Sequence, residues 1–597
     1  MSEYIAPLRD MQFALKELAG LEQVAQLPGC EEATPDLVDA VLEEAAKFAE
    51  GVLSPLNWSG DQEGARWHDK AVTMPAGFKE AYKLFADSGW TALAAESEWG
   101  GQGLPKVVSA AVNEMWKSAN HSFSLCPLLT AGAIEALVLT GSDALKATYL
   151  EKMVSGLWTG TMNLTEPSAG SDLAAVRTRA EPQADGSYKI FGQKIFITYG
   201  EHDMADNIIH LVLARTPTAP EGVKGISLFV VPKFLVNDDG SLGARNDAYC
   251  VSIEHKLGIH ASPTAIMAFG DHSGAIGYLV GEENRGLEYM FIMMNAARFG
   301  VGLEGVAACE RAYQRARDYA RDRIQCTDIG VRGGPKVAII QHPDVRRMLM
   351  TMKSYAEATR ALAYVVAAAH DAAVHHADAE TRKRNQAFVD LMIPVVKGWS
   401  TESGVTIASI GVQVHGGMGY VEETGAAQHL RDAQISTIYE GTTGIQANDL
   451  IGRKMAREGG ATLKSVIAMM RALDSDLAKQ GGAHFAAIRS RLAAGVDALA
   501  TAGEWVVATY GKDVRAASAG AVPFLKLLGI VAGGWQMARA ALIAQAKVDA
   551  GDGDPFFPAK VVTARFYADH VLSGAAGLAS SVTDGAEGVM ALHEDMF

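Results

Sequence analysis

Residues 188–198, YKIFGQKIFIT, decide the fold of the middle of the chain. β-Branched and aromatic residues dominate this stretch, which is typical of a strand. Turn-forming residues such as Asp185-Gly186 and Asp238-Asp239-Gly240 separate it from neighbouring runs. Three runs of the same character follow: IIHLVLA at 208–214, ISLFVVP at 226–232 and YCVSIEHKL at 249–257. We therefore predict an antiparallel β domain over residues 159–281.

Helical spacing surrounds this β domain. Apolar residues three and four positions apart, the spacing of one helix face, recur before it from Leu37 to Phe48 and after it from Met290 to Ala297. The last part of the chain is Ala-rich and helical in pattern, with a break at Pro523. We predict an α+β protein in four parts: an amino-terminal arm and helical domain at 1–158, the β domain at 159–281, a helical bundle at 282–455 and an additional helical domain at 456–597.

The composition is that of a folded, acidic protein. Its 597 residues are 49% hydrophobic and 20% charged, which excludes disorder of the whole chain. Fifty-three Lys and Arg against 69 Asp and Glu give a formal net charge of −16, which opposes non-specific binding to nucleic acid or anionic lipid. The five cysteines are an odd number without C-x-x-C spacing. This argues against a disulfide framework and a zinc site, so we expect no metal.

The sequence shows no targeting or membrane-spanning pattern. The first twenty residues lack a basic region leading into a long apolar core, so we expect no signal peptide. The most apolar late stretch, 527–538, lies between Lys526 and Arg539 and is shorter than the ~20 residues of a membrane span. We expect a soluble cytoplasmic protein that binds no nucleic acid and has no membrane span.

The motif Gly300-Val301-Gly302-Leu303-Glu304-Gly305 has the G-x-G-x-x-G spacing of a dinucleotide-binding loop. That function requires a strand immediately before the glycines. Residues 290–298, MFIMMNAAR, instead have a helical pattern. We therefore interpret the glycines as small residues that permit close packing of helices, and we reject a nicotinamide site.

Three other segments combine small and polar residues in a way that suits a ligand: TEPSAGSD at 165–172, QVHGGMGY at 413–420 and IYEGTTG at 438–444. Exposed backbone N–H groups and hydroxyls suit a phosphate or the edge of a heteroaromatic ring. Clustered glycines allow close approach of backbone to a ligand or another chain. Each segment also has an ordinary interpretation: a Pro/Gly/Ser loop, a structural histidine at His415 and a solvated loop carboxylate at Glu440.

Taken in order, these segments resemble the acyl-CoA dehydrogenase family. EHKLGIHAS at 254–262, GEENRG at 281–286 and YARDR at 319–323 lie between them and extend the resemblance over about 35–450. The resemblance implies FAD, an acyl-CoA thioester substrate and an order of helical domain, β-barrel domain and helical bundle. The arm, the added carboxy-terminal domain and the run EETGAAQ at 422–428 look closest to the extended branch that includes 3-(methylthio)propionyl-CoA dehydrogenases.

The resemblance also implies a mechanism. Glu440 matches the base that removes the α proton, while the β hydride passes to flavin N5 and a trans-2-enoyl-CoA forms. An exposed Glu, with a pKa of about 4.3, is too weak a base for this proton, so burial should raise its pKa. The backbone N–H of Glu440 would polarise the thioester carbonyl. The positions matching substrate contacts are Ser171, Arg298, Tyr439, Glu440 and Gly441.

The positions matching flavin contacts are Met162, Leu164, Thr165, Gly170, Ser171, Phe196, Thr198, Arg323, Gln325, Gln413, Gly416, Gly417 and Thr442. Phe196 stands where the family usually has Trp, so a ring remains but the indole N–H is lost. Gln325 and Gln428 also depart from the family pattern. Arg298 has a plain alternative as a structural ion pair.

The partners also follow from the resemblance. In relatives, the segment with Gln413, Gly416 and Gly417 reaches the flavin of a neighbouring subunit, which implies a homo-oligomer; the bulky added domain favours a dimer. The expected electron acceptor is an electron-transfer flavoprotein. The alternatives are an acyl-CoA oxidase that uses O2 and a flavoprotein of this fold that acts as a binding module. We expect a short- or medium-chain substrate, including a methylthio-substituted propionyl group.

Overall fold

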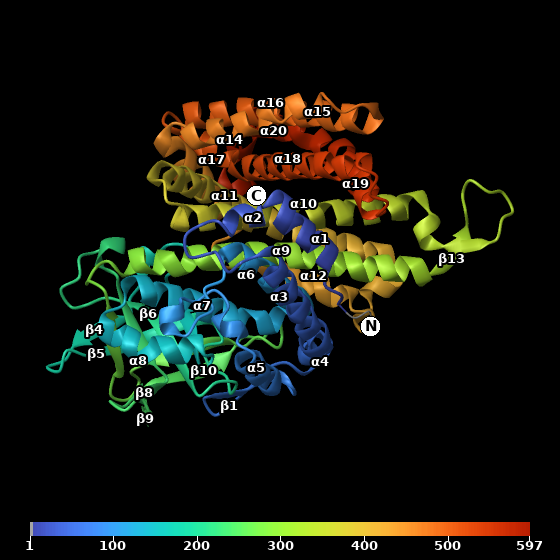
Figure 1. Ribbon diagram of the computed structural model, residues 1–597. Coiled ribbons are helices and arrows are strands. Elements are labelled where there is room, and N and C mark those ends of the chain that lie inside the picture. Colours follow the sequence, from blue (N-terminus) through green and yellow to red (C-terminus); the bar gives the residue numbers. More distant parts are fainter. Residues whose placement is uncertain (1–3) are drawn as a thin grey trace. The chain divides into compact units, whose positions relative to one another are not determined.

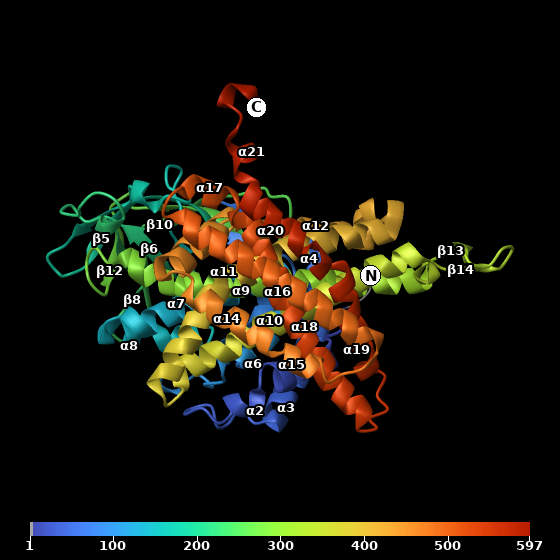
Figure 2. The same cartoon turned by 90° about the horizontal axis from the view of Figure 1, so that it is seen from above.

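The computed structural model describes residues 4–597, and the chain forms two compact units (Figures 1 and 2). The second unit comprises Lys47–Leu104 and Ala119–Ala297 and holds the main sheet. The first unit comprises the residues up to Ala46, Pro105–Ser118 and Arg298–Phe597, and it is helical apart from one hairpin. The division of the sequence into four parts stays a prediction.

An eight-stranded sheet forms the core of the second unit. Its strands are β3 (Trp158–Asn163), β4 (Arg179–Pro182), β5 (Tyr188–Thr198), β6 (Asn207–Ala214), β7 (Ser227–Pro232), β10 (Ala248–Ile253), β11 (Thr264–Phe269) and β12 (Ala275–Val280). Their order is β10-β11-β5-β12-β7-β6-β3, and β4 pairs with β5. Every pair is antiparallel except β3 and β6, which run parallel and so depart from the antiparallel prediction. β6 and β7 are buried on both faces, which explains their unbroken apolar runs.

Short elements complete the second unit. The helices are α4 (Pro55–Glu63), α5 (Phe78–Asp87), α7 (His121–Thr140) and α8 (Asp143–Val154), and two hairpins pair β1 (Arg66–His68) with β2 (Ala71–Thr73) and β8 (Phe234–Val236) with β9 (Leu242–Arg245). Asn120 caps α7 by accepting from the Phe123 N–H at 3.0 Å. Apolar side chains of α7 and α8, including Leu137 and Leu150, pack with Leu211 and Leu228 of the sheet in one core.

Long helices make up the first unit. They are α6 (Lys106–Ala119), α9 (Gly286–Asp322, in this unit from Arg298 onward), α10 (Pro343–His375), α11 (Ala379–His415), α12 (Ala426–Gln434) and α13 (Thr443–Asp449), preceded by the arm with α1 (Leu8–Phe13), α2 (Leu21–Val24) and α3 (Pro35–Phe48). A hairpin of β13 (Ile324–Thr327) and β14 (Lys336–Ala338) extends beyond the ends of α9 and α10 in both views (Figures 1 and 2).

The Gly300–Gly305 motif lies inside α9, as its interpretation as a packing motif predicts. A Cβ on Gly302 would lie 2.6 Å from Val396, and one on Gly305 would lie 2.3 Å from the Ser400 carbonyl carbon. Larger side chains would therefore push α9 away from α11. The two glycines hold these helices close together at the level of residues 396–400.

The added carboxy-terminal helices are α14 (Ala461–Ala472), α15 (Asp474–Leu477), α16 (Gly482–Tyr510), α17 (Val514–Ala519), α18 (Ala521–Asp549), α19 (Phe556–His570), α20 (Ala575–Asp584) and α21 (Ala586–Met590). α18 packs on α10, α11, α16 and α19. Gly529 and Gly533 of α18 receive the ring of Trp399, because a Cβ on either glycine would lie within 2.6 Å of an atom of that ring. The domain thus braces α11, the helix that also contacts α9.

Two described helices, α7 and α18, are long and apolar enough to cross a bilayer. Their most apolar windows are 61% and 83% buried within the protein, and the core helices of globular proteins share this character. α18 spans 29 residues and is longer than the apolar stretch 527–538 considered from the sequence. These helices are weak evidence for a membrane span.

Candidate active site

Glu440 lies in a strained turn that precedes α13. Its φ is +57°, a left-handed conformation that costs a side-chain-bearing residue about 1–2 kcal/mol, and Gly441 follows with φ +84°. Strain of this kind persists where surrounding contacts enforce it, and it is frequent at active sites. Here Gln446 Nε2 donates to the Glu440 carbonyl at 3.0 Å, and Lys397 Nζ donates to the Gly441 carbonyl at 2.7 Å. The Thr442 hydroxyl caps α13 by accepting from the Ile445 N–H.

The carboxyl group of Glu440 is a strengthened base. The residue is half-buried, and loss of hydration raises its pKa to about 7, although Arg298 and Lys397 oppose the rise. Glu304 adds a like charge that raises this pKa further. Burial also lowers the pKa of the fully buried Lys397, to about 8. A carboxyl group with a pKa near neutrality can accept a proton from a weak acid at physiological pH.

A buried carboxylate anchors the residue that precedes the base. The Tyr439 hydroxyl donates to Glu304 Oε2 at 2.5 Å, and Lys117 Nζ lies 3.7 Å from Glu304 Oε1. The side chains of Lys117 and Glu304 are at most 1% exposed. The charges of this pair are thus partly compensated inside the protein, and the Tyr439 ring is held in one orientation.

Arg298 forms the structural ion pair that its alternative interpretation describes. Its Nη1 lies 3.3 Å from Asp449 Oδ2 with both side chains buried, and Asp449 also accepts from Arg453. The Arg298 Nε has no hydrogen-bond partner among the described residues. Arg298 also favours the ionised form of Glu440, so it influences the base electrostatically. Its role in substrate binding stays a prediction.

The segment 165–172 lies beside β5 in the second unit. Lys194 Nζ donates to Glu166 Oε1 at 2.8 Å and to the Leu164 carbonyl at 3.0 Å, and the Ile195 N–H donates to the Thr165 carbonyl. Glu166 also accepts from the backbone N–H groups of Arg177 and Thr178. A buried ion pair with these hydrogen bonds fixes the loop against the strand. Residues 164–166 are therefore held beside Lys194 and Ile195 of β5. That this loop and residues 196–198 form one flavin surface stays a prediction.

Phe196 has an unusual conformation for a strand residue. Its φ is +59°, and its side chain is 59% exposed although it belongs to the long strand β5. The register between β5 and β11 shifts at this point, between the pairs Ala265↔Ile197 and Met267↔Lys194. An irregularity of this kind re-aims a side chain out of the sheet. The result is an exposed flat ring. Among the other predicted flavin positions of this unit, Thr165 and Thr198 are half-buried and Gly170 and Ser171 are exposed.

The remaining predicted positions lie at the ends of α9 and α11. Gln413, Gly416 and Gly417 are exposed, and so are Arg323 and Gln325 at the start of the β13–β14 hairpin. His415 itself is structural, because its Nδ1 bonds to the Gly411 carbonyl at 2.7 Å and its ring stacks on Tyr319. This stacking places the carboxyl end of α9 beside the glycine segment.

Five charged residues at these sites were not predicted from the sequence: Lys117, Glu166, Lys194, Glu304 and Lys397. Each is buried. Lys397 could have been noticed from its place inside the apolar run MIPVVKGW at 392–399, because a lysine is seldom buried without a partner. Glu304 lay inside the motif already interpreted as a packing motif, and nothing in the local pattern identifies its partners Lys117 and Tyr439.

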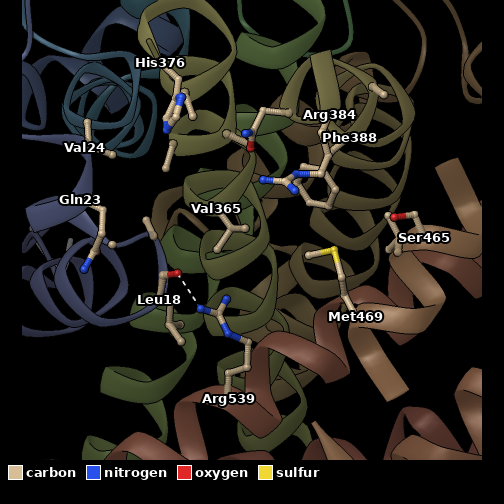
Figure 3. Close-up of a pocket in the computed structure, with 18 of the residues that line it drawn as sticks. Leu18, Gln23, Val24, Val365, His376, Arg384, Phe388, Ser465, Met469 and Arg539 are labelled. Atoms are coloured by element: carbon tan, nitrogen blue, oxygen red, sulfur yellow. Dashed lines mark hydrogen bonds between the residues drawn. The ribbon is translucent and has the colours of Figure 1, made fainter. Parts of the chain in front are cut away.

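A cavity of about 1260 Å³ lies elsewhere in the first unit, between the arm, the α10–α11 hairpin, α14 and α18 (Figure 3). Val365, Phe388 and Met469 give it apolar walls, while Arg384 and Arg539 enter from two different helices. Arg539 Nη2 donates to the Leu18 carbonyl at 3.0 Å, which ties α18 to the arm. No predicted site residue lines this cavity, so the chemistry is assigned to the Glu440 turn.

Family profiles match the chain in order along its length. They are "Acyl-CoA dehydrogenase, N-terminal domain" at residues 37–157, "Acyl-CoA dehydrogenase, middle domain" at 161–271, "Acyl-CoA dehydrogenase, C-terminal domain" at 284–455 and "Acetyl-CoA dehydrogenase C-terminal like" at 462–593.

Individual relatives agree with these profiles. The chain is 52% identical over 581 residues to the 3-methylmercaptopropionyl-CoA dehydrogenase of Ruegeria pomeroyi, covering 97% of this chain and 98% of the relative. It is 36% identical over 591 residues to the broad-specificity linear acyl-CoA dehydrogenase FadE5 of Mycobacterium tuberculosis, covering 96% of each. A solved acyl-CoA dehydrogenase of Bacillus anthracis complexed with FAD has a TM-score of 0.74 at 20% identity, over 98% of this chain and 93% of that chain, and so shares the fold.

These matches confirm the predicted family, the α+β fold class with its added carboxy-terminal domain, the enzyme class and FAD as the cofactor. They do not test the individual site residues, which stay predictions. With four profiles in order and a relative that is 52% identical over 97% of this chain, the chain belongs to the acyl-CoA dehydrogenase family.

Proposed function

We propose that the protein oxidises a saturated acyl-CoA to the trans-2-enoyl-CoA with Glu440 as the base, and that its substrate is 3-(methylthio)propionyl-CoA or another short- or medium-chain acyl-CoA. The observation that carries the proposal is the half-buried Glu440 carboxyl, whose pKa is raised to about 7, on a turn held by Lys397 and Gln446. The choice of substrate is supported by the Ruegeria pomeroyi relative, which is 52% identical.

The reaction removes two hydrogens from the acyl chain, and a residue of the protein accepts one of them, the α proton. The Glu440 carboxylate accepts the α proton, and the electron pair of that C–H bond forms the new double bond as the β hydrogen leaves with its electrons. When bound, FAD supplies the acceptor for that hydride at flavin N5. The backbone N–H of Glu440 would donate to the thioester oxygen, where negative charge develops. The left-handed φ of Glu440 fixes the direction of this N–H relative to its own carboxyl group.

The residues of the second unit fit a flavin. The exposed Phe196 ring offers a flat apolar wall, and the half-buried Thr165 and the exposed Ser171 add hydroxyl donors. A Cβ on Gly170 would have nothing within 4 Å, so the loop leaves open space at that position. These residues of the second unit would hold the cofactor by stacking and hydrogen bonds. The exposed Arg323 of the first unit is a permanent cation, of the kind that binds a pyrophosphate.

Phe196→Gly tests the aromatic wall. We expect FAD to be retained about 10-fold less tightly or worse, because the ring contact is lost. The unfolding free energy of the apoprotein should change by less than about 1 kcal/mol, because relief of the left-handed strain offsets the added chain entropy of glycine. FAD content after dialysis and apoprotein urea unfolding would measure the two effects. Val251→Gly, at an exposed position of β10, is the matched control and should keep its FAD; equal FAD loss in both variants would contradict a flavin contact.

Several partners complete the proposal. The exposed Gln413, Gly416 and Gly417, next to a Tyr420 side chain that is 90% exposed, are available to the flavin of a second copy in a homodimer. An electron-transfer flavoprotein accepts the electrons, and the enzyme works in the cytoplasm. Analytical ultracentrifugation of the holoenzyme would test the dimer, and a monomer that retains FAD would contradict it.

The function is tested by anaerobic titration of the yellow holoenzyme. Rapid bleaching of the flavin is expected with one or more members of an acyl-CoA series that includes 3-(methylthio)propionyl-CoA, butyryl-CoA and octanoyl-CoA. The methylthio and short-chain thioesters should react fastest, and the product should be the trans-2-enoyl-CoA. Absence of bleaching throughout the series would reject the function, and fastest bleaching by octanoyl-CoA would reject the preferred substrate class.

A further inference from the structure

Two buried charges outside the proposed proton transfer contact the Glu440 turn. Lys397 belongs to α11 and Glu304 belongs to α9, and both are buried. The close packing of Gly302 against Val396 and of Gly305 against Ser400 brings the segments that carry these two side chains together. Burial of charges at this depth is costly unless they are paired, so their contacts call for an explanation.

Lys397 contacts the residue after the base. Its Nζ donates to the Gly441 carbonyl at 2.7 Å, while Gln446 Nε2 donates to the carbonyl of Glu440 itself at 3.0 Å. Two successive carbonyl groups of the left-handed turn therefore have fixed donors. A lysine in this place holds the backbone and also brings a positive charge toward the base.

Glu304 contacts the residue before the base. The Tyr439 hydroxyl donates to it at 2.5 Å, and Lys117 lies 3.7 Å from its other oxygen. The turn is thus held on one side through an anion and on the other through a cation. The residues immediately before and after Glu440 both have a buried charged partner.

We propose that Lys397 and Glu304 are a matched pair of positioning residues, which hold the Glu440 turn from both sides and act on the base with charges of opposite sign. This proposal rests on Glu440 being the base of the proposed function. Lys397 favours the ionised carboxylate and Glu304 disfavours it, in agreement with their opposite effects on the pKa of Glu440.

Other charged groups lie near the turn, and neither substitution removes them. Arg298 of α9 favours ionisation of Glu440 directly, and it is paired with Asp449, which also binds Arg453. The remaining charged neighbours around the turn are Lys117 of α6, beside Glu304; Glu402 of α11, which accepts from Thr443; and Asp432 of α12, which raises the pKa of Tyr439. These groups are common to all variants, so differences between variants report on Lys397 and Glu304.

The test is the pH dependence of anaerobic flavin bleaching by the holoenzyme with 3-(methylthio)propionyl-CoA and with butyryl-CoA. In the wild type, the rate should rise with pH through about 7 as Glu440 loses its proton. In Lys397→Met, the rising limb of this pH–rate profile should shift to higher pH by about 1 unit, because the Glu440 carboxylate loses a favourable charge. In Glu304→Gln it should move down by about 1 pH unit, because a like charge is removed. Lys397→Arg, which keeps the charge, should retain the wild-type limb.

Matched controls separate this effect from general damage to the core. Lys560→Met and Glu310→Gln also remove a buried charge, but these residues pair with Asp10 and with Arg360 and leave the Glu440 turn intact. Both should lower stability and leave the limb in place. Glu304→Gln is nearly isosteric and keeps the test decisive if Lys397→Met does not fold.

The possible results separate failure of the positioning role from failure of the proposed dehydrogenation. The positioning role would be rejected if the rising limb of the pH–rate profile stayed in place in Lys397→Met and Glu304→Gln, or if it shifted in the same direction in both. Bleaching by the wild type would still support the proposed function. A wild type that no thioester bleaches would overturn the proposed function and the positioning pair together.

Discussion

Glu440→Gln should slow flavin reduction by acyl-CoA by about 10²–10⁴-fold, because an amide has nearly the same shape but accepts no proton from the α carbon. The measurement is the anaerobic bleaching rate in a stopped-flow instrument. FAD content should stay at the wild-type level, since the predicted flavin contacts that lie on the 162–171 segment and β5 are unchanged. Acyl-CoA should still bind and perturb the flavin spectrum.

For Glu440→Gln we also predict a change in the pH dependence of folding stability. The folded-state pKa of Glu440, about 7, lies above its unfolded value of about 4.3, so ionisation opposes folding at higher pH. The Gln variant should therefore gain stability over the wild type as pH rises from about 4.3 to 7 and keep that gain above 7. Glu423→Gln, at an exposed position of the short 3-10 helix Glu422–Thr424, is the control and should change neither rate nor stability. Unimpaired bleaching in Glu440→Gln would reject Glu440 as the base.

The features predicted from the sequence are those encoded in local patterns. The run at 188–198 predicts a strand because its alternation and β-branched residues are local properties, and β5 has the same bounds. The glycines at 300–305 were interpreted correctly because the residues before them have a helical pattern. The candidate base was found through a resemblance in segment order, and the structure supplies the physical reason for its strength, which is loss of hydration.

The features that were missed depend on pairing between distant segments. Lys397 and Gly441 are 44 residues apart, and Tyr439 and Glu304 are 135 apart, so no local pattern links them. The parallel pairing of β3 with β6 is likewise determined by the tertiary fold, although each strand has an ordinary strand pattern. Phe196 was noted as an aromatic substitution, but its left-handed φ follows from the register shift against β11. Burial and register are decided by the whole fold.

A buried arginine ties the arm to the helical bundle, and the arm residue that it binds also contacts the added domain. Arg360 of α10 is 1% exposed and donates to Glu114 of α6, Glu310 of α9 and Asp10 of the arm, at 2.6, 2.8 and 2.5 Å. Asp10 also accepts from Lys560 of α19, which links the arm to the added domain. Burial opposes ionisation of Asp10, but Lys560 and Arg360 outweigh burial and hold its pKa well below the usual range.

Arg360→Met should lower the free energy of unfolding of the first unit by about 3–5 kcal/mol, because it leaves buried carboxylates without their main counter-charge. The measurement is urea denaturation of the holoenzyme, taken at the first transition since a chain of two units need not unfold in one step. The loss should be greatest above about pH 4. There Asp10 is ionised in both states and its depressed pKa contributes fully, whereas the contribution falls away as pH drops through the folded-state pKa.

Arg9→Met is the matched control because it also removes an arginine that links the arm to the added domain. Arg9 Nη2 lies 2.9 Å from Asp554, but the two side chains are 55% and 37% exposed, so the pair should contribute less than about 1 kcal/mol. Both variants remove one positive charge, so a general effect of net charge would destabilise them equally. Equal losses would contradict the central role of Arg360. A large loss confined to Arg360→Met would show that burial of the network, and not its charge alone, makes the amino-terminal arm part of the folded helical unit.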